Sequence, residues 1–129
     1  MKEDVPGLSF INQLRPVTYR LDREAINEYT GVNARREKLR EENPGAEFLT
    51  GDKYSPVTTG FIAQEVEEAA KSIGYDFSGV DAPKNDKDMY GLRYSDFVVP
   101  LVKAVQEQQA EIEQLKAKLE ELEKKLAEK

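Results

Sequence analysis

Residues 98–129 read VVPLVKAVQEQQAEIEQLKAKLEELEKKLAEK, and this stretch decides the architecture that the sequence predicts. Apolar residues recur at the first and fourth positions, a and d, of a seven-residue repeat. We call these positions the a/d stripe: at a, Val98, Val105, Ile112, Leu119 and Leu126, and at d, Leu101, Gln108, Leu115 and Leu122. Pro100 falls in the first turns, where a missing N–H costs least. Four heptads predict a coiled-coil helix, because such a stripe needs partner helices to bury it.

The charges beside the stripe favour parallel helices. Glu111 at position g can meet Lys116 at e of a neighbouring helix, and Lys118 can meet Glu123 in the same way. Valine and isoleucine at a with leucine at d favour two strands, but leucine at the later a positions weakens that preference. The pattern therefore leaves the number of helices open. Residues 117–129 also resemble an added tag in composition, although the unbroken repeat favours one continuous helix.

Residues 1–97 predict a small globular head, which makes the fold class α+β. The expected helices cover residues 8–15, 24–42 and 63–73, and the expected extended segments cover 17–21, 58–62, 77–80 and 89–94. Gly74 provides a natural left-handed end for the third helix. Residues 46–54 predict a loop or a short strand. The domain prediction is a head over residues 1–97 and a coiled-coil helix over residues 98–129.

Residues 22–52 form the most polar segment of the head and resemble an insertion. Sparse apolar residues and a break at Gly31 predict a solvated helical lobe. The segment holds four close basic residues, which could alternatively form a local basic patch: Arg35, Arg36, Lys38 and Arg40. Nearby glutamates offset their charge, so the solvated lobe is the favoured interpretation.

The composition excludes several classes of function. The 129 residues hold 19 Lys and Arg against 25 Asp and Glu, a net charge of −6, which argues against a nucleic-acid partner. His, Cys and Trp are absent, so histidine catalysis, cysteine nucleophiles and ordinary zinc sites are excluded. No acidic loop has calcium-binding spacing, and no cofactor or metal is expected. No apolar run is long enough for a membrane span, and the N-terminus does not resemble a signal peptide.

Most polar and aromatic candidates have a structural explanation. The serines are expected to cap helices or to lie at helix ends and in loops: Ser9, Ser55, Ser72, Ser78 and Ser95. Three glutamates are expected to form a solvated helix face: Glu65, Glu67 and Glu68. The apolar stripe of that helix is expected to be Ile62, Val66, Ala69 and Ile73. The aromatic core is expected to be Phe10, Tyr19, Phe61, Tyr90, Tyr94 and Phe97.

Three blocks of sequence together resemble a known family. They are GLSFINQLRPVTY at residues 7–19, TGFIAQEVE at 59–67, and YGLRYS at 90–95 leading into PLVKAVQEQ at 100–108. The order and the sequences of these blocks are similar to those of the peptidase S74 family, the intramolecular chaperone domain. Such domains lie at the C-terminus of phage tail spikes, tail fibres and endosialidases. The resemblance leaves out the polar segment at residues 22–52.

The resemblance implies a homotrimer that guides folding of an upstream β-rich fibre and then releases itself through a Ser–Lys dyad. The family motif places Lys five residues after the nucleophilic Ser, and Lys2-Glu3-Asp4-Val5 matches its end, so Lys2 falls on the general base. The serine would lie before the first residue given. The expectation is a released, further trimmed and proteolytically inert domain with Met1 added. Its origin would be a fibre precursor folded in the host cytoplasm, or a bacterial or prophage protein.

Three functions remain open from the sequence. The first is a trimerisation and folding module whose partners are itself and the upstream fibre domain of the same polypeptide. The second is a self-cleaving peptidase, an activity that this chain alone would lack. The third, independent of the resemblance, is a dimeric coiled-coil adaptor whose head binds another protein.

Overall fold

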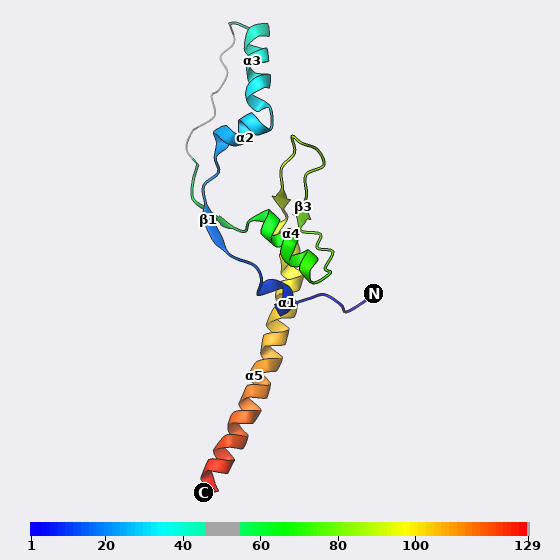
Figure 1. Ribbon diagram of the computed structural model, residues 1–129. Helices are drawn as coiled ribbons and strands as arrows, with labels where there is room; N and C mark the ends of the chain where they lie inside the picture. Colours follow the sequence, from blue (N-terminus) through cyan, green and yellow to red (C-terminus); the bar gives the residue numbers. More distant parts are fainter. Residues whose placement is uncertain (46–54, 129) are drawn as a thin grey trace.

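A single long helix dominates the computed structural model, which describes residues 1–45 and 55–128. Helix α5 (Val98–Ala127) has 30 residues and extends away from a small head. Helices α2 and α3 project from the opposite side of that head (Figure 1). The fold is therefore mixed, with short helices and small antiparallel strand pairs in the head, as the sequence predicts.

The chain enters the head through a single helical turn, α1 (Leu8–Ile11). The expected helix over residues 8–15 is too long, because the residue before Pro16 is disfavoured in the helical region. The N–H groups of Gln13 and Leu14 instead bond to carbonyls three residues back. The expected cap from Ser9 is also wrong: the carbonyl of Gly7 accepts the N–H groups of Phe10 and Ile11, and the N–H of Leu8 donates to Glu107.

Two small antiparallel sheets build the rest of the head. Strand β1 (Val17–Tyr19) pairs with β2 (Thr58–Gly60), with Val17 opposite Gly60. Strand β3 (Val80–Asp81) pairs with β4 (Gly91–Leu92). The second pair joins two of the expected extended segments, residues 77–80 and 89–94, although both strands are shorter than predicted.

Helix α4 (Ala63–Ser72) crosses the head between the two sheets and ends as the sequence predicts. Gly74 adopts φ +66°, the left-handed conformation that glycine tolerates best. The buried face differs from the predicted stripe in part. Val66, Ala69 and Ala70 are buried, whereas Ile62 and Ile73 are more than one third exposed.

The polar segment forms an arm of two helices, α2 (Arg23–Tyr29) and α3 (Val32–Glu42). The carboxylate of Asp22 caps α2 by accepting the N–H of Ala25 at 3.0 Å. Gly31, at φ +76°, breaks the predicted helix into two. Neither helix buries a residue, which fits a solvated lobe. The loop or strand predicted for residues 46–54 lies outside the described residues.

The core of the head is a cluster of aromatic rings around Phe10. Its ring centroid lies 4.9 Å from that of Phe77, which in turn lies 4.8 Å from that of Phe97. Val66 and Ala70 of α4 complete the buried cluster. Of the expected aromatic core, Phe10 and Phe97 are buried, but Tyr94 is 47% exposed. The prediction missed Phe77, which lies between the last turn of α4 and β3.

Candidate functional site: the α5 stripe and its junction with the N-terminal segment

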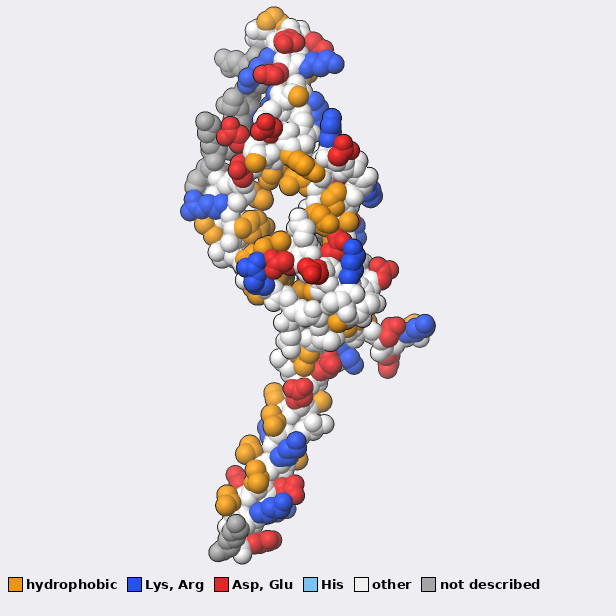
Figure 2. Space-filling view, viewed as in Figure 1, with side chains coloured by type: hydrophobic (Ala, Val, Ile, Leu, Met, Phe, Trp, Pro, Cys, Tyr) orange, Lys and Arg blue, Asp and Glu red, His pale blue; other side chains and the backbone are white. Residues whose placement is uncertain are grey.

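The a/d stripe of α5 is exposed along its whole length. Its apolar side chains are between 44% exposed, at Ile112, and 71% exposed, at Leu126, and Gln108 is exposed with them. In Figure 2 apolar side chains line the protruding helix, interspersed with charged ones. Monomeric soluble proteins rarely expose an apolar surface this extended.

The first turns of α5 are apolar on nearly every side. Pro100 and Ala104 are buried against the head of the same chain. Val99 and Val102 lie outside both that contact and the a/d stripe, and they are 59% and 51% exposed. A helix that is apolar all round is normally buried on all sides, so further surface is available here for a partner.

A close contact joins the N-terminal segment to α5. Gly7 is buried, and a Cβ added there would lie 1.9 Å from Oε1 of Glu107 and 2.8 Å from the backbone nitrogen of Ala104. The N–H of Leu8 donates to Oε1 of Glu107 at 2.9 Å. Glycine at position 7 therefore lets α1 lie directly on the α5 backbone. The sequence offers little sign of this contact, because its partners are 99 residues apart.

Lys2 precedes this contact and is exposed. It lies in the irregular segment before α1 and belongs to no ion pair among the described residues. Gly7 and Glu107 thus connect the segment that carries Lys2 to α5. The described residues bring no serine hydroxyl into a hydrogen bond with Lys2.

Two of the serines, Ser72 and Ser78, have clear structural partners. The Ser72 hydroxyl donates to the carbonyl of Ala69 at 2.7 Å, and it also lies 3.0 Å from Oε1 of Gln13. The Ser78 hydroxyl donates to the carboxylate of Asp96 at 3.0 Å. Ser95 does not cap α5 as predicted, because α5 follows directly on the 3₁₀ turn η1 (Tyr94–Phe97) without a side-chain cap.

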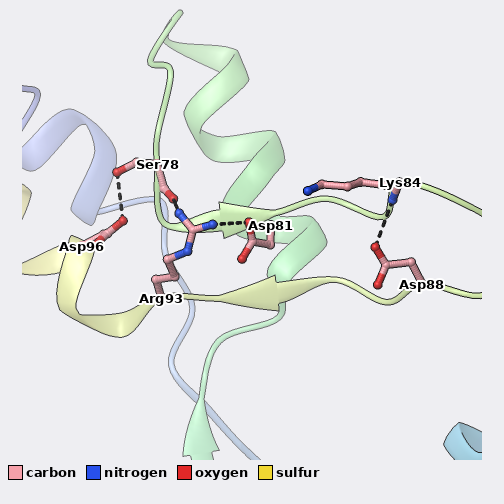
Figure 3. A network of polar contacts seen from close by, with 6 residues as sticks. All are labelled: Ser78, Asp81, Lys84, Asp88, Arg93 and Asp96. Carbon is pink, nitrogen blue, oxygen red and sulfur yellow. Dashed lines mark hydrogen bonds and ion pairs between the residues drawn. The ribbon is translucent and has the colours of Figure 1, made fainter.

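A polar network ties the β3–β4 hairpin to the start of α5 (Figure 3). The Arg93 guanidinium donates to the carbonyl of Ser78 at 3.0 Å and forms an ion pair with Asp81. Ser78 in turn donates to Asp96 in η1. At the far end of the hairpin, the N–H of Lys84 donates to Asp88 at 3.1 Å. These contacts lie at the surface of the head. They hold the hairpin beside η1 and do not form a reactive centre.

Two ion pairs occupy the glutamates of α4. Arg15 donates to both carboxylate oxygens of Glu65, at 3.0 and 2.6 Å. This hydrogen bonding lowers the pKa of Glu65 and raises the pKa of Arg15. Lys71 similarly lowers the pKa of Glu67 through a hydrogen bond. The solvated face expected from the sequence is therefore partly a paired one, and Arg15 links the end of the α1 turn to α4.

A broad groove of about 880 Å³ lies between the arm, β1 and the β3–β4 hairpin. Figure 2 shows the head hollowed at this level, with apolar side chains around the opening. Four tyrosines contribute to the lining: Tyr19, Tyr29, Tyr90 and Tyr94. Apolar side chains such as Val17, Phe61 and Leu92 line the groove beside them, so it offers mainly packing surface.

The described residues offer neither a metal centre nor a membrane span. Across residues 1–45 and 55–128, no three His, Cys, Asp or Glu side chains converge as metal ligands would. In the same ranges, no helix combines the length and the apolar content that crossing a membrane requires.

Comparison with known proteins identifies the family. The family model described as Peptidase_S74, chaperone of endosialidase, matches residues 1–75, more than half of the 129 residues. The match contains the first two sequence blocks and Lys2, whereas the third block and α5 lie beyond it. No curated protein and no solved structure shows a significant match to the chain. The matched segment includes α1, the arm and α4, and the chain therefore belongs to the Peptidase_S74 family, the chaperones of endosialidase.

Proposed function

We propose that the chain is an intramolecular chaperone that trimerises through α5 and sets the register of an upstream fibre or spike. The observation that carries the proposal is the exposed a/d stripe in a chain of the chaperone-of-endosialidase family. The stripe has four heptads, and its apolar residues are exposed in the part of the chain that the structure describes. Assembly through it would bury these side chains and so supply the free energy of association.

Trimerisation would help a fibre because of how such fibres fold. Interdigitated β-structures depend on contacts between distant residues, and these contacts form slowly. Holding three chains together raises their effective concentration to roughly the millimolar range and converts chain encounter into an intramolecular step. The charges at Glu111 and Lys116 and at Lys118 and Glu123 favour a parallel arrangement. Parallel helices would also place the three upstream chains in the same register.

The oligomer can be tested by sedimentation equilibrium on the intact chain. We expect a trimer, and a variant carrying Leu115→Ser and Leu122→Ser should sediment as a monomer with its head still folded. Ala117→Ser is the matched control, because Ala117 lies on the outer side of the same heptads. Deleting residues 106–129 should also weaken association. A deletion variant that remained a stable trimer would contradict the role of the stripe.

A dimeric adaptor is the second candidate. Valine and isoleucine at the early a positions with leucine at d favour two strands, which supports this alternative. A concentration-independent dimer in the same sedimentation experiment would favour it over the chaperone trimer.

The proposal extends to self-release in a chain that carries the upstream serine. Lys2 would act as the general base and take the proton of the serine hydroxyl as its oxygen attacks the scissile carbonyl. The amide C–N bond would then break, and the departing amine would take that proton back from Lys2. Water would finally hydrolyse the resulting ester to a carboxylate and the free serine. Support comes from the match of residues 2–5 to the family motif and from the family model that includes Lys2.

This step is tested in a chain extended upstream with its native sequence. We expect the extended chain to cleave itself, as seen on a denaturing gel, and Lys2→Ala to abolish cleavage while assembly persists. Lys2→Arg should also fail, since arginine keeps the charge but cannot give up its proton. Lys84→Ala, an exposed lysine of the hairpin, is the control. Cleavage that survived Lys2→Ala would exclude Lys2 as the base.

A further inference from the structure

We infer that Val99 and Val102 form a second contact between chains, on the head of the neighbouring protomer, and this inference rests on the proposed parallel assembly. Both side chains are about half exposed. Neither belongs to the a/d stripe, so packing of the stripe alone does not bury them. The occupant we propose is the α1 surface of a second copy, where Leu8 and Ile11 are only half-buried.

The heptad positions place the two surfaces on opposite flanks of α5. Pro100 and Ala104, at c and g, are buried against the same chain's head, and the α1 turn is bonded to Glu107 at the next c position. The head therefore covers the c/g flank. Val99 and Val102 occupy b and e, which form the flank on the other side of the a/d stripe.

Parallel coiled coils bring these two flanks together. The g positions of one helix lie beside the e positions of the next, around the whole assembly. The head on the c/g flank of one protomer therefore faces the b/e flank of its neighbour. Because rotation about an axis parallel to the helices preserves height, α1 meets the neighbour at its own level. Along the axis of α5, the α1 segment begins next to Val102, because Gly7 lies against the backbone of residues 103 and 104.

The sequence limits this apolar flank to the part of α5 beside the head. The later b and e positions are polar or charged through the following heptads: Gln106, Gln109, Glu113, Lys116, Glu120 and Glu123. Lys103, at the outward position f of the first heptad, is also charged. Apart from the small Ala127 at the end of α5, apolar residues thus occupy b and e only where a neighbouring head would cover them, which a plain coiled coil does not require.

Cross-linking between different chains tests the contact directly, because the chain has no cysteine of its own. Chains carrying Ile11→Cys are assembled with size-tagged chains carrying Val102→Cys and then oxidised. We expect a mixed disulfide between the two. The matched control replaces the second chain with Lys103→Cys, one residue away but facing outward, and it should not cross-link. A separate chain carrying Leu122→Cys measures, by its own disulfide, whether the coiled coil forms without reference to the head contact.

The outcomes separate the two proposals. Cross-linking at residue 122 without the mixed 11–102 product, or with an equally strong Lys103 product, overturns this inference and leaves the trimer standing. A chain that sediments as a monomer and fails to cross-link at residue 122 removes the assembly and the inference with it.

A substitution gives a second measurement. The double variant Val99→Ser and Val102→Ser should raise the dissociation constant of the assembly roughly tenfold for each valine replaced. Each valine is half exposed in the single chain, and it is this exposed apolar surface that assembly would remove from water. The thermal unfolding of the dissociated chain should not change, since both side chains are in contact with water there. Lys103→Ser is the control. An unchanged dissociation constant would contradict the proposed interface.

Discussion

At the scale of single residues, the structure depends on one glycine and one carboxylate. Gly7 and Glu107 hold the N-terminal turn against α5, and no larger residue fits at position 7 without movement. Arg15 then ties the end of that turn to Glu65 of α4. Each of these contacts joins segments that are distant in sequence, so each can be weakened without altering local helix propensity.

Gly7→Ala should destabilise the head by about 1–3 kcal/mol, the usual cost of adding a methyl group to a filled site. The new Cβ would collide with Glu107 and with the α5 backbone. Thermal unfolding at low protein concentration measures this effect. Gly45→Ala is the control, because a Cβ there has no neighbour within 4 Å. Equal unfolding temperatures for the two variants would show that α1 does not depend on the close approach.

Arg15→Gln should raise the pKa of Glu65 toward its ordinary value, because the hydrogen bond from Arg15 is the largest cause of its lowering. The folded-state pKa lies below the unfolded one, so the pair adds stability above the ordinary glutamate pKa. That contribution disappears as pH falls through the lowered value. Carbon-detected NMR titration measures the shift. The pKa of Glu67, lowered by Lys71, should stay unchanged as an internal control.

At the scale of elements, the sequence predicted those whose signals are local. The heptads located α5, Gly74 located the end of α4, and Gly31 located the break in the arm. The family motif likewise pointed to Lys2, whose catalytic role stays a prediction. The sequence did not reveal the β1–β2 pairing, the position of Phe77 or the Glu107 contact. Those features arise from packing between distant segments, which periodicity does not encode.

Phe10→Ala should cost about 3–5 kcal/mol, because Phe10 is fully buried among the rings of Phe77, Tyr75 and Phe97. We expect this loss to unfold much of the head, since few other large side chains are buried. Tyrosine signals in near-ultraviolet circular dichroism measure it. Ile73→Ala is the control, as Ile73 is 37% exposed. A head that retained its unfolding temperature after Phe10→Ala would contradict the proposed centre of the core.

At the scale of the whole molecule, the head lies between two projections of different character. Helix α5 extends on one side with an apolar stripe, and the α2–α3 arm extends on the other with no buried residue (Figure 1). The arm leaves the head after β1 and the chain returns at β2, with Tyr19 opposite Thr58. The arm is therefore attached to the head through the paired strands β1 and β2. Helices α2 and α3 contribute no residue to the core cluster.

Replacing residues 22–56 with a short glycine-containing turn should leave the head folded and the oligomer unchanged. The paired strands β1 and β2 would then form an ordinary hairpin, and the change in unfolding temperature should be only a few degrees. Thermal unfolding and sedimentation together measure the two properties. Replacing residues 77–80 instead removes Phe77 and should unfold the head. Loss of the oligomer in the arm variant would show that the arm takes part in assembly.

The hydrogen bond between Leu8 and Glu107 also has a consequence for protein synthesis. The ribosome adds residue 107 only 99 residues after residue 8. The α1 turn must therefore wait for α5 before it can dock, although domains usually fold in the order of translation. A polypeptide terminated early lacks both the acceptor for α1 and the stripe. Only chains translated past residue 107 can close the head in this way.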